Sequence, residues 1–577
     1  MKSSLARIPA ARWLDGYRRG DLLQDLTAAL IVTVLLIPQS LAYALLAGLP
    51  PEVGLYASIL PLLGYALFGT SRTLSVGPVA VISLMTATAL GSVTAQGAVD
   101  YVSAAAVLAL LSGLFLIVMG LLKLGFITHF ISHSVISGFI SASAILIAAS
   151  QLKHLIGVRA DGDELPQLLS ALASEIRHPH LPTLAVGLFV IAFLLLARRY
   201  GARCLVAVGL SDARASLLAK TAPLFGVLAS IGLAYFLALE TRGVSLSGAI
   251  PAGLPSLGLS MPSWELVRAL APSALLISII GYVESVSVAK TLGARRRQRI
   301  DPDQELLGLG AANLASSVSG GFPVAGGFSR SAVNFDAGAA TQMASIFTAV
   351  GIALASLFFT PVLYYLPKTA LAAIIIVAVL SLVDFAILKR TWRFSRSDCY
   401  AVSATIVTTL FFGVEVGLAS GVAFSIALHL YRTSRPHIAE VGLVPDSEHF
   451  RNIKRYKVIT VPEILTLRPD ESLFFANASY LEDRIRQLVY ERDRVAHVVL
   501  LCSAVNEVDF SALEMLEGIN RHLADQGVRL HLSEVKGPVM DSLQKTGFLD
   551  HLSGNVYLSQ IDAFKKLRAS VTNECGG

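Results

Sequence analysis

A long apolar part of the chain is interrupted at Pro323-Val324-Ala325-Gly326-Gly327-Phe328-Ser329-Arg330-Ser331-Ala332 by two glycines and an arginine. Backbone groups inside a bilayer need internal hydrogen bonds, so such a break is tolerated only where protein or a water-filled cavity satisfies them. A charge at that depth costs roughly 2.5–3.5 kcal/mol and commonly marks a substrate or ion pathway. A second break, Ser75-Val76-Gly77-Pro78, occupies a comparable position in the first half. Paired breaks of this kind predict the binding site of a transporter built from an inverted repeat.

Composition indicates a membrane protein. Of the 577 residues, 54% are hydrophobic and 15% are charged, whereas a soluble domain averages about 25% charged residues. The four cysteines (204, 399, 502 and 575) form no CxxC pair, so we expect neither a metal site nor a disulfide framework. There is no P-loop or other nucleotide-binding motif. We therefore expect transport driven by gradients, without a cofactor, an enzymatic reaction or a nucleic-acid partner.

Apolar stretches long enough to cross a bilayer occupy residues 24–432. The expected spans are roughly 24–47, 53–69, 78–93, 101–122, 126–150, 181–198, 217–238, 266–290, 304–319, 328–341, 343–365, 368–388, 398–412 and 414–431. This makes about fourteen, of which the third and tenth are short, as half-helices would be.

The distribution of basic residues predicts the orientation of the spans. Residues 1–23 are basic and no cleavage site follows them, so they are expected to form a retained cytoplasmic N-terminus. The connections that would then face inside hold the main Lys and Arg clusters, including 198–220, 295–299 and 389–396. Fourteen spans place the C-terminus inside as well. The cluster Arg295 to Arg299 is expected to do no more than set this topology.

The two breaks predict a site for an anion. Proline lacks the N–H group that would be unbonded at a first helical position, so the first half-helix is expected to begin at Pro78. The free N–H groups of Val79 and Ala80 would lie at its positive end. The opposing half-helix would begin with Phe328, Ser329 and Arg330. Two such N-termini facing each other at mid-membrane, with one guanidinium, can hold an anion.

Two side chains of the first span complete the expected pocket. Gln39 can donate an amide hydrogen bond, and Tyr43 can close the pocket wall. Ordinary packing between helices is the alternative for both residues. For Arg330 the alternative is a structural bond to backbone carbonyls or to the spans that gate the site. Asn334 and Asp336 are expected to steady the tenth span.

A soluble α/β domain is predicted over residues 440–570, where short apolar strands alternate with charged helices. Residues 498–502 and 528–532 are expected to be strands, and residues 511–526 a helix. Ser511-Ala512-Leu513-Glu514 matches a capping box, which by itself explains a serine and a glutamate at that spacing.

Several motifs resemble those of the sulfate permease family, also called SulP or solute carrier 26. The resemblance rests on Ile37-Pro38-Gln39-Ser40-Leu41-Ala42-Tyr43-Ala44, Gly48-Leu49-Pro50-Pro51-Glu52-Val53-Gly54-Leu55-Tyr56, Gly69-Thr70-Ser71-Arg72, Gly77-Pro78-Val79-Ala80-Val81-Ile82-Ser83-Leu84 and Gly327-Phe328-Ser329-Arg330-Ser331-Ala332-Val333-Asn334. The C-terminal segment resembles the cytoplasmic STAS domain of that family. The resemblance covers essentially the whole chain.

The resemblance implies a seven-plus-seven inverted repeat in a homodimer. A core of spans 1–4 and 8–11 would move against a gate of spans 5–7 and 12–14, in an elevator-type cycle at the plasma (inner) membrane. The family's anion contacts would fall at Gln39, Tyr43, Val79, Ser329 and Arg330. The segment Val508-Asp509-Phe510-Ser511-Ala512-Leu513 resembles the loop that carries the phosphorylated serine of anti-sigma factor antagonists. Ser511 is thus a candidate phosphosite, in a domain that could contact a regulatory protein.

Glu284 is the one carboxylate well inside an expected span, and it resembles the eighth-span acid of proton-coupled sulfate permeases. Burial and a nearby cation act in opposite senses on the protonation of a carboxyl group, which suits a coupling residue. A fixed ion pair with Arg330 is the alternative.

We therefore expect a secondary active transporter that carries an inorganic oxyanion, with sulfate favoured, together with protons. Transport of bicarbonate or dicarboxylates stays open. An anion exchanger, channel or voltage-driven motor on the same fold also stays open, as does a sensor that signals through the STAS domain.

Overall fold

The structure is a computed structural model and describes residues 9–94, 100–129, 132–158, 164–175, 179–248, 253–258 and 262–574. Residues 1–8 of the expected N-terminal segment and Cys575 therefore lie outside the described residues. The chain divides into two compact units, Met1–Ser425 and Ile426–Gly577.

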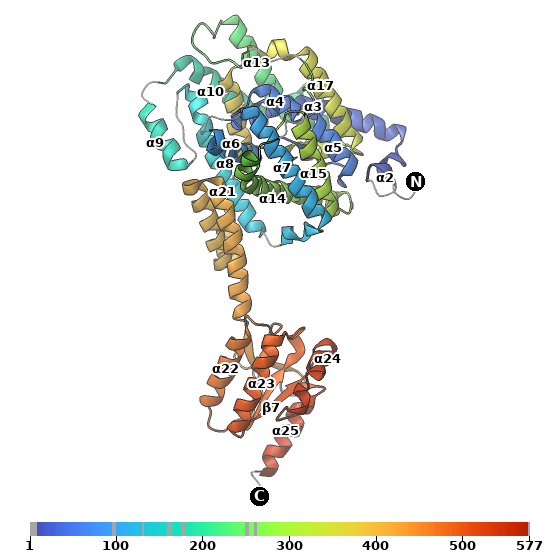
Figure 1. The fold of residues 1–577 in the computed structure, drawn as a ribbon, viewed down its shortest axis with the longest axis vertical. Helices are drawn as coiled ribbons and strands as arrows, with labels where there is room; N and C mark the ends of the chain where they lie inside the picture. Colours follow the sequence, from blue (N-terminus) through green and yellow to red (C-terminus); the bar gives the residue numbers. More distant parts are fainter. Residues whose placement is uncertain are drawn as a thin grey trace. The chain divides into compact units, whose positions relative to one another are not determined.

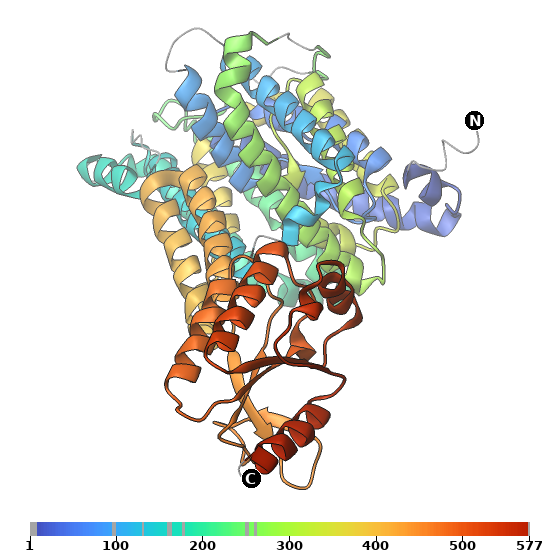
Figure 2. The ribbon, with the colours of Figure 1, turned by 60° about the horizontal axis from the view of Figure 1, so that its bottom comes forward.

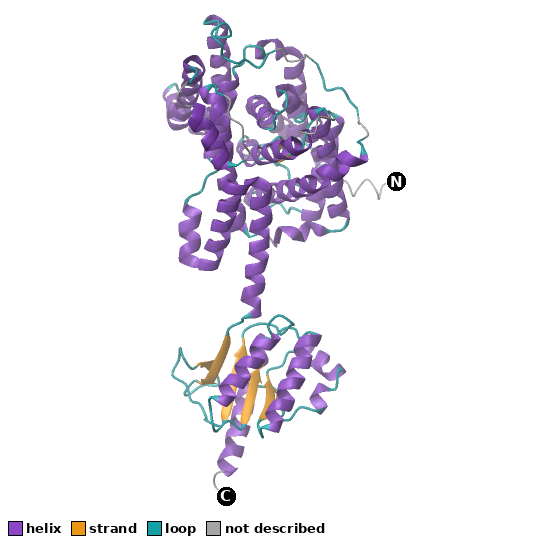
Figure 3. Cartoon of the chain, turned by 60° about the vertical axis from the view of Figure 1, so that its left-hand side comes forward, coloured by secondary structure: helices purple, strands orange, loops and turns teal. Residues whose placement is uncertain are grey.

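The first unit is built from helices (Figures 1 and 3). The helices of its first half are α2 (Pro9–Leu14), α3 (Arg19–Leu46), α4 (Pro51–Tyr56), α5 (Leu60–Phe68), α6 (Ala80–Thr94), α7 (Tyr101–Leu121), α8 (His133–Ile156), α9 (Leu165–Glu175), α10 (Leu181–Leu196), α11 (Ala202–Ala207), α12 (Asp212–Ala219) and α13 (Ala222–Phe236). Those that follow are α14 (Trp264–Arg295), α15 (Pro302–Val318), α16 (Phe328–Asp336), α17 (Met343–Phe358), α18 (Thr360–Leu363), α19 (Lys368–Leu380), α20 (Ala386–Phe394) and α21 (Arg396–Ser434).

A helix lies at each of the fourteen expected spans, with α4 and α5 together forming the second. Within the described residues, seven helices are long and apolar enough to cross a membrane, and four more are apolar but shorter. Large apolar side chains such as Leu114, Val118 and Leu121 of α7 are 46–69% exposed. An apolar surface of this kind suits contact with lipid. The described part of the chain also contains α2, α9, α11, α12, α18 and α20, which were not predicted as separate helices.

The last two expected spans form a helical hairpin. Gly413, with φ 85° and ψ 173°, separates the two arms of α21. A Cβ atom on Gly417 would lie 2.0 Å from Oγ1 of Thr409, and one on Gly421 would lie 2.6 Å from Oγ1 of Thr405. Because the arms approach this closely, only glycine fits at these two positions. Small residues at such contacts let membrane helices pack through their backbones.

The two halves of the chain meet at a short crossing of strands. β1 (Val76–Gly77) pairs antiparallel with β2 (Ala325–Gly326), roughly 250 residues away in sequence. Each strand leads into a short helix, β1 into α6 and β2 into α16, so the two strand–helix units run in opposite directions. Helices of the two halves also interleave, since α7 packs against both α14 and α15 (Figure 2).

The second unit is an α/β domain, as predicted, and its sheet has six strands in the order β4-β3-β5-β6-β7-β8. The strands are β3 (Ile438–Leu443), β4 (Phe450–Asn452), β5 (Ile464–Pro469), β6 (His497–Leu501), β7 (Arg529–Ser533) and β8 (Val556–Tyr557). β5 to β8 are parallel, whereas β3 and β4 are antiparallel to their neighbours. The helices are α22 (Ala478–Tyr490), α23 (Phe510–Asp525), α24 (Gly537–Lys545) and α25 (Gln560–Glu574). Apolar side chains of the sheet, α22, α23 and α24 form the main core.

The expected capping box at Ser511 is wrong. Asp509 is the N-cap of α23, and its carboxylate accepts the N–H of Ala512 at 2.8 Å. Ser511 is the second residue of the helix and is exposed. An aspartate two residues earlier satisfies the same kind of free N–H group, so the serine has no capping duty.

A pair of histidines is buried between β6 and β7. The N–H of Asn555 donates to Nδ1 of His531 at 2.9 Å, so this ring carries its proton on Nε2. That nitrogen lies 3.1 Å from Nδ1 of His497, which therefore accepts. Burial, then the charges of His497 and Arg529, lower the pKa of His531 to about 4.

We expect the α/β domain to lose stability as pH falls from about 6.5 to about 4. In that window the unfolded chain binds more protons than the folded one, so the free energy of unfolding decreases by up to about 1.4 kcal/mol per pH unit. Urea unfolding of residues 436–577 between pH 7.5 and 4.5 measures this slope, with His522→Gln as a control at a partly exposed histidine. A slope that is unchanged in His531→Leu would contradict the assignment.

Candidate functional site

The two half-helices begin on either side of the strand crossing. The carbonyl of Val79 accepts the N–H of Ser83 at 2.9 Å, which makes Val79 the N-cap and Ala80 the first residue of α6. The expectation that Pro78 begins this helix is therefore wrong, because β1 extends to Gly77 and the proline forms the link. α16 begins at Phe328 as expected, with Gly327 as its N-cap.

Arg330 is buried at the crossing, with a relative exposure of 2%. Its Nη2 donates to the carbonyl of Ala325 at 3.4 Å, while its buried Nη1 has no hydrogen-bond partner among the described residues. A Cβ atom on Gly77 would lie 2.9 Å from Nη1, and one on Gly327 would lie 3.0 Å from Nε. Both glycines thus leave room for the guanidinium against the backbone. A buried cation with unsatisfied donors is costly, and a bound anion would remove that cost.

Side chains of each half hold the crossing together. Ser331 accepts the N–H of Ser75 at 2.9 Å, and the N–H of Gly327 donates to the carbonyl of Ser75 at 3.2 Å. Asn334 donates from Nδ2 to the carbonyl of Thr73 at 3.0 Å. These bonds tie α16 to the segment that precedes α6, which is the steadying role expected for Asn334.

Some of the residues predicted to contact the anion line a cavity, and the others lie near the buried crossing of β1 and β2. Gln39, Phe328 and Ser329 line one cavity of about 600 Å³. Gln39 is buried at the cavity wall, whereas Phe328 and Ser329 are exposed at the start of α16. Tyr43 lies one helical turn beyond Gln39, within electrostatic range of Arg330 and Glu284. Val79 and Ala80, 5% and 6% exposed, lie at the start of α6.

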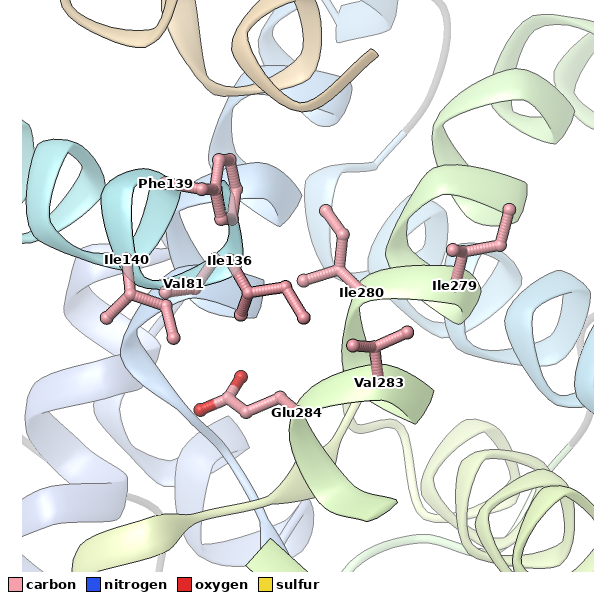
Figure 4. Close-up of a pocket in the computed structure, with 8 residues that line it drawn as sticks. All are labelled: Val81, Ile136, Phe139, Ile140, Ile279, Ile280, Val283 and Glu284. Carbon is pink, nitrogen blue, oxygen red and sulfur yellow. The ribbon is translucent and has the colours of Figure 1, made fainter. Parts of the chain in front are cut away.

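Glu284 lies on α14 and borders a second, smaller cavity (Figure 4). The cavity has a volume of about 20 Å³, which is room for about one water molecule. The other lining residues are apolar: Val81, Ile136, Phe139, Ile140, Ile279, Ile280 and Val283. Glu284 is within electrostatic range of Arg330. In the described part of the chain it nevertheless forms no ion pair or hydrogen bond, so the fixed-pair alternative is not present here.

Two buried carboxylates at helix ends were not singled out from the sequence. Glu305 accepts bonds from the Tyr65 hydroxyl at 2.7 Å and from the N–H groups of Thr70 and Ser71 at 2.8 and 3.1 Å. Asp25 of α3 accepts from the N–H groups of Ala340 and Thr341 and from the Thr341 hydroxyl. Both carboxylates are fully bonded and act as structural clamps. Glu305 lies in the first turn of α15, where acidic residues are too common to identify this role from sequence alone.

The expectation that Arg295 to Arg299 only set topology is wrong for Arg296. Its guanidinium donates to the carbonyls of Phe335, at 3.1 Å, and Ala339. It also stacks on the ring of Phe335, 4.5 Å from the ring centroid. Arg296 thus caps the C-terminal end of α16, where unpaired carbonyls favour a cation.

Comparison with known proteins agrees with this architecture. The sulfate permease family model matches residues 22–405, and the STAS domain model matches residues 455–563. Sulfate transporter 4.1 (chloroplastic) of Arabidopsis thaliana is 36% identical over 94% of this chain and 79% of its own length. A probable sulfate transporter of Mycobacterium tuberculosis is 33% identical over 94% of this chain and 96% of its own length.

A solved structure supports the fold. The murine solute carrier 26 family member A9, an anion transporter in the inward-facing state, matches with a TM-score of 0.88 and 23% identity. The match covers 98% of this chain and 95% of the murine chain. The family model covers more than half of this chain, and the family resemblance of its motifs is confirmed. This multi-pass integral membrane protein with a C-terminal STAS domain belongs to the sulfate permease family.

Proposed function

We propose that this protein is a secondary active transporter that carries sulfate across the membrane together with protons. The observation that supports this most strongly is the guanidinium of Arg330, which is buried at the start of α16 and whose Nη1 has no hydrogen-bond partner among the described residues. An anion bound there would meet this guanidinium and the free N–H groups at the beginnings of α6 and α16. The site residues are Gln39, Tyr43, Val79, Ala80, Phe328, Ser329 and Arg330.

Sulfate is favoured among the candidate anions. A tetrahedral oxyanion has several hydrogen-bond acceptor oxygens. These could accept bonds from the planar guanidinium group and from backbone N–H groups of two different helices. The relatives that are 36% and 33% identical are named as a sulfate transporter and a probable sulfate transporter. Bicarbonate and dicarboxylates carry the same kind of acceptor oxygens and are the competing substrates.

Glu284 is proposed to carry the coupled proton. Its side chain lies in a nearly apolar cavity within electrostatic range of Arg330 but is not bonded to it. An anion at Arg330 would weaken the field of that cation at Glu284, and this change favours protonation of the carboxyl group. Binding of the anion and binding of the proton would thus support each other.

We propose that alternating access occurs by movement of the core, spans 1–4 and 8–11, relative to the gate, spans 5–7 and 12–14. The cavity supports this division, because it lies between α3 and α16 of the core and α10, α12, α13 and α19 of the gate. A relative movement of the two groups would open this cavity to one side of the membrane or the other.

The remaining proposals concern assembly and regulation. We expect a homodimer in the plasma (inner) membrane with both termini in the cytoplasm, in line with the positive-inside distribution. Ser511 is exposed at the second position of α23, where a phosphate group would be favoured by the helix dipole. A regulatory protein could bind the STAS domain when Ser511 is phosphorylated.

Purified full-length protein in liposomes tests the proposed function. With the outside acidic, uptake of radiolabelled sulfate is expected to exceed its equilibrium level and to collapse when a protonophore is added. Unlabelled sulfate should compete better than bicarbonate, succinate or chloride. Uptake that ignores the pH gradient but follows internal anion would indicate an exchanger, and conductive flux would indicate a channel.

A further inference from the structure

Two cations line the cavity that contains Gln39 and Ser329. Arg198 and Lys220 are the charged residues among those that border it in the described part of the chain. Arg330 itself lies behind the wall and is not among the lining residues. An anion that enters this cavity would therefore meet Arg198 and Lys220 before it reaches the buried site.

The charge of Lys220 is neutralised. Its Nζ lies 2.5 Å from the carboxylate of Asp336, the last residue of α16. The two side chains are 35% and 43% exposed, so the pair is in contact with solvent. This pair joins the connection before α13 to the half-helix that carries Arg330. The expected steadying role of Asp336 thus corresponds to an ion pair.

Arg198 has no such partner. No hydrogen bond, ion pair or ring contact involves it among the described residues, and its side chain is exposed. It lies in the π-helical turn η2 (Ala197–Gly201), which interrupts the helix between α10 and α11. The neighbouring Arg199 of the same turn stacks 5.6 Å from the Tyr200 ring and is not a lining residue. Such turns are rare and often occur at functional sites, because they change the direction of the side chains that follow.

We propose that Arg198 forms an outer position for the transported oxyanion, from which the anion passes to Ser329, Gln39 and then Arg330. The inference rests on the proposed function, which it extends to a residue outside the buried site. Among the described residues that line the cavity, Arg198 is the cation without a counter-charge, and an unpaired cation there raises the local concentration of anions. The Lys220–Asp336 pair adds no net charge there, so Arg198 supplies the attraction.

Arg198→Gln tests the proposal, with Arg199→Gln as the matched control from the same turn. At about 10 mM ionic strength, Arg198→Gln is expected to raise KM for sulfate uptake about three- to tenfold and to leave the maximal rate within about twofold. The Debye length falls from about 30 Å at 10 mM to about 3 Å at 1 M, so the difference in KM should disappear at high salt. Arg199→Gln should keep the KM of the unmodified protein at both ionic strengths.

The double variant Lys220→Gln/Asp336→Asn removes the other cation with its partner and preserves net charge. Its KM is expected to stay within about twofold of the original value. Equal KM values for Arg198→Gln and Arg199→Gln would overturn the outer position while sulfate uptake by the unmodified protein still supported the proposed function. A rise in KM for Arg198→Gln that persists at 1 M salt would also overturn it, because it would indicate a structural effect. Absence of sulfate uptake by the unmodified protein would instead refute the proposed function.

Discussion

Arg330→Ala is expected to abolish sulfate binding and uptake while the protein remains folded. The substitution removes the cation at the strand crossing, where Nη1 has no partner among the described residues. It also eliminates the cost of burying an unpaired charge, so the melting temperature without anion should not decrease. A ligand at 100 times its Kd stabilises the folded state by about 2.7 kcal/mol, which gives a measurable thermal shift.

Thermal unfolding in detergent, with and without sulfate, measures this effect. Sulfate should raise the melting temperature of the unmodified protein and leave that of Arg330→Ala unchanged. Arg330→Lys keeps the charge without the planar fork, so it should bind more weakly than the original residue but not lose binding altogether. A sulfate-induced shift of normal size in Arg330→Ala would show that the anion binds elsewhere.

Glu284→Gln is expected to abolish accumulation of sulfate driven by a pH gradient. Glutamine keeps the shape and the hydrogen-bonding capacity of the side chain but cannot take up a proton. Because Glu284 forms no bond with another described residue, the substitution should not disturb packing. Sulfate bound at Arg330 could still exchange between the two sides, so counterflow should survive.

Proteoliposomes measure both activities in one preparation. Uptake with an acidic exterior reports coupling, and uptake of labelled sulfate into vesicles loaded with unlabelled sulfate reports exchange. Glu265→Gln, an exposed acid in the first turn of α14, is the matched control and should retain both activities. Accumulation of sulfate by Glu284→Gln at the normal level would assign the proton to another group.

Much of the membrane unit could be predicted from local sequence. Apolar stretches predicted helices at the expected positions, and within the described residues seven of these helices are long and apolar enough to cross a membrane. The breaks at residues 75–78 and 323–332 were visible because glycine, proline and arginine are costly in hydrocarbon without internal partners. The same breaks directed attention to Arg330.

The errors at Pro78 and Arg296 arose where a local pattern competed with a contact from a distant segment, and the error at Ser511 arose where a residue two positions earlier made the expected contact. Pro78 fits a first helical position, yet pairing of Gly77 with Ala325 extends the strand and delays the helix to Ala80. Ser511 fits a capping box, but Asp509 provides the cap. Arg296 was expected to set topology only, whereas the fold brings it to the carbonyls of Phe335, near the end of α16, and Ala339, just beyond it.

The sequence by itself determined the class of protein, the positions of the spans and the two half-helices, because these depend on transfer of short segments between water and lipid. Only the tertiary structure decided which charges are paired. Glu305, Asp25 and Lys220 have partners roughly 100–300 residues away, while Arg330, Glu284 and Arg198 form no ion pair with another described residue. A charge that the fold has already neutralised cannot serve an anion or a proton, and pairing depends on three-dimensional proximity that the spacing of residues along the chain does not encode.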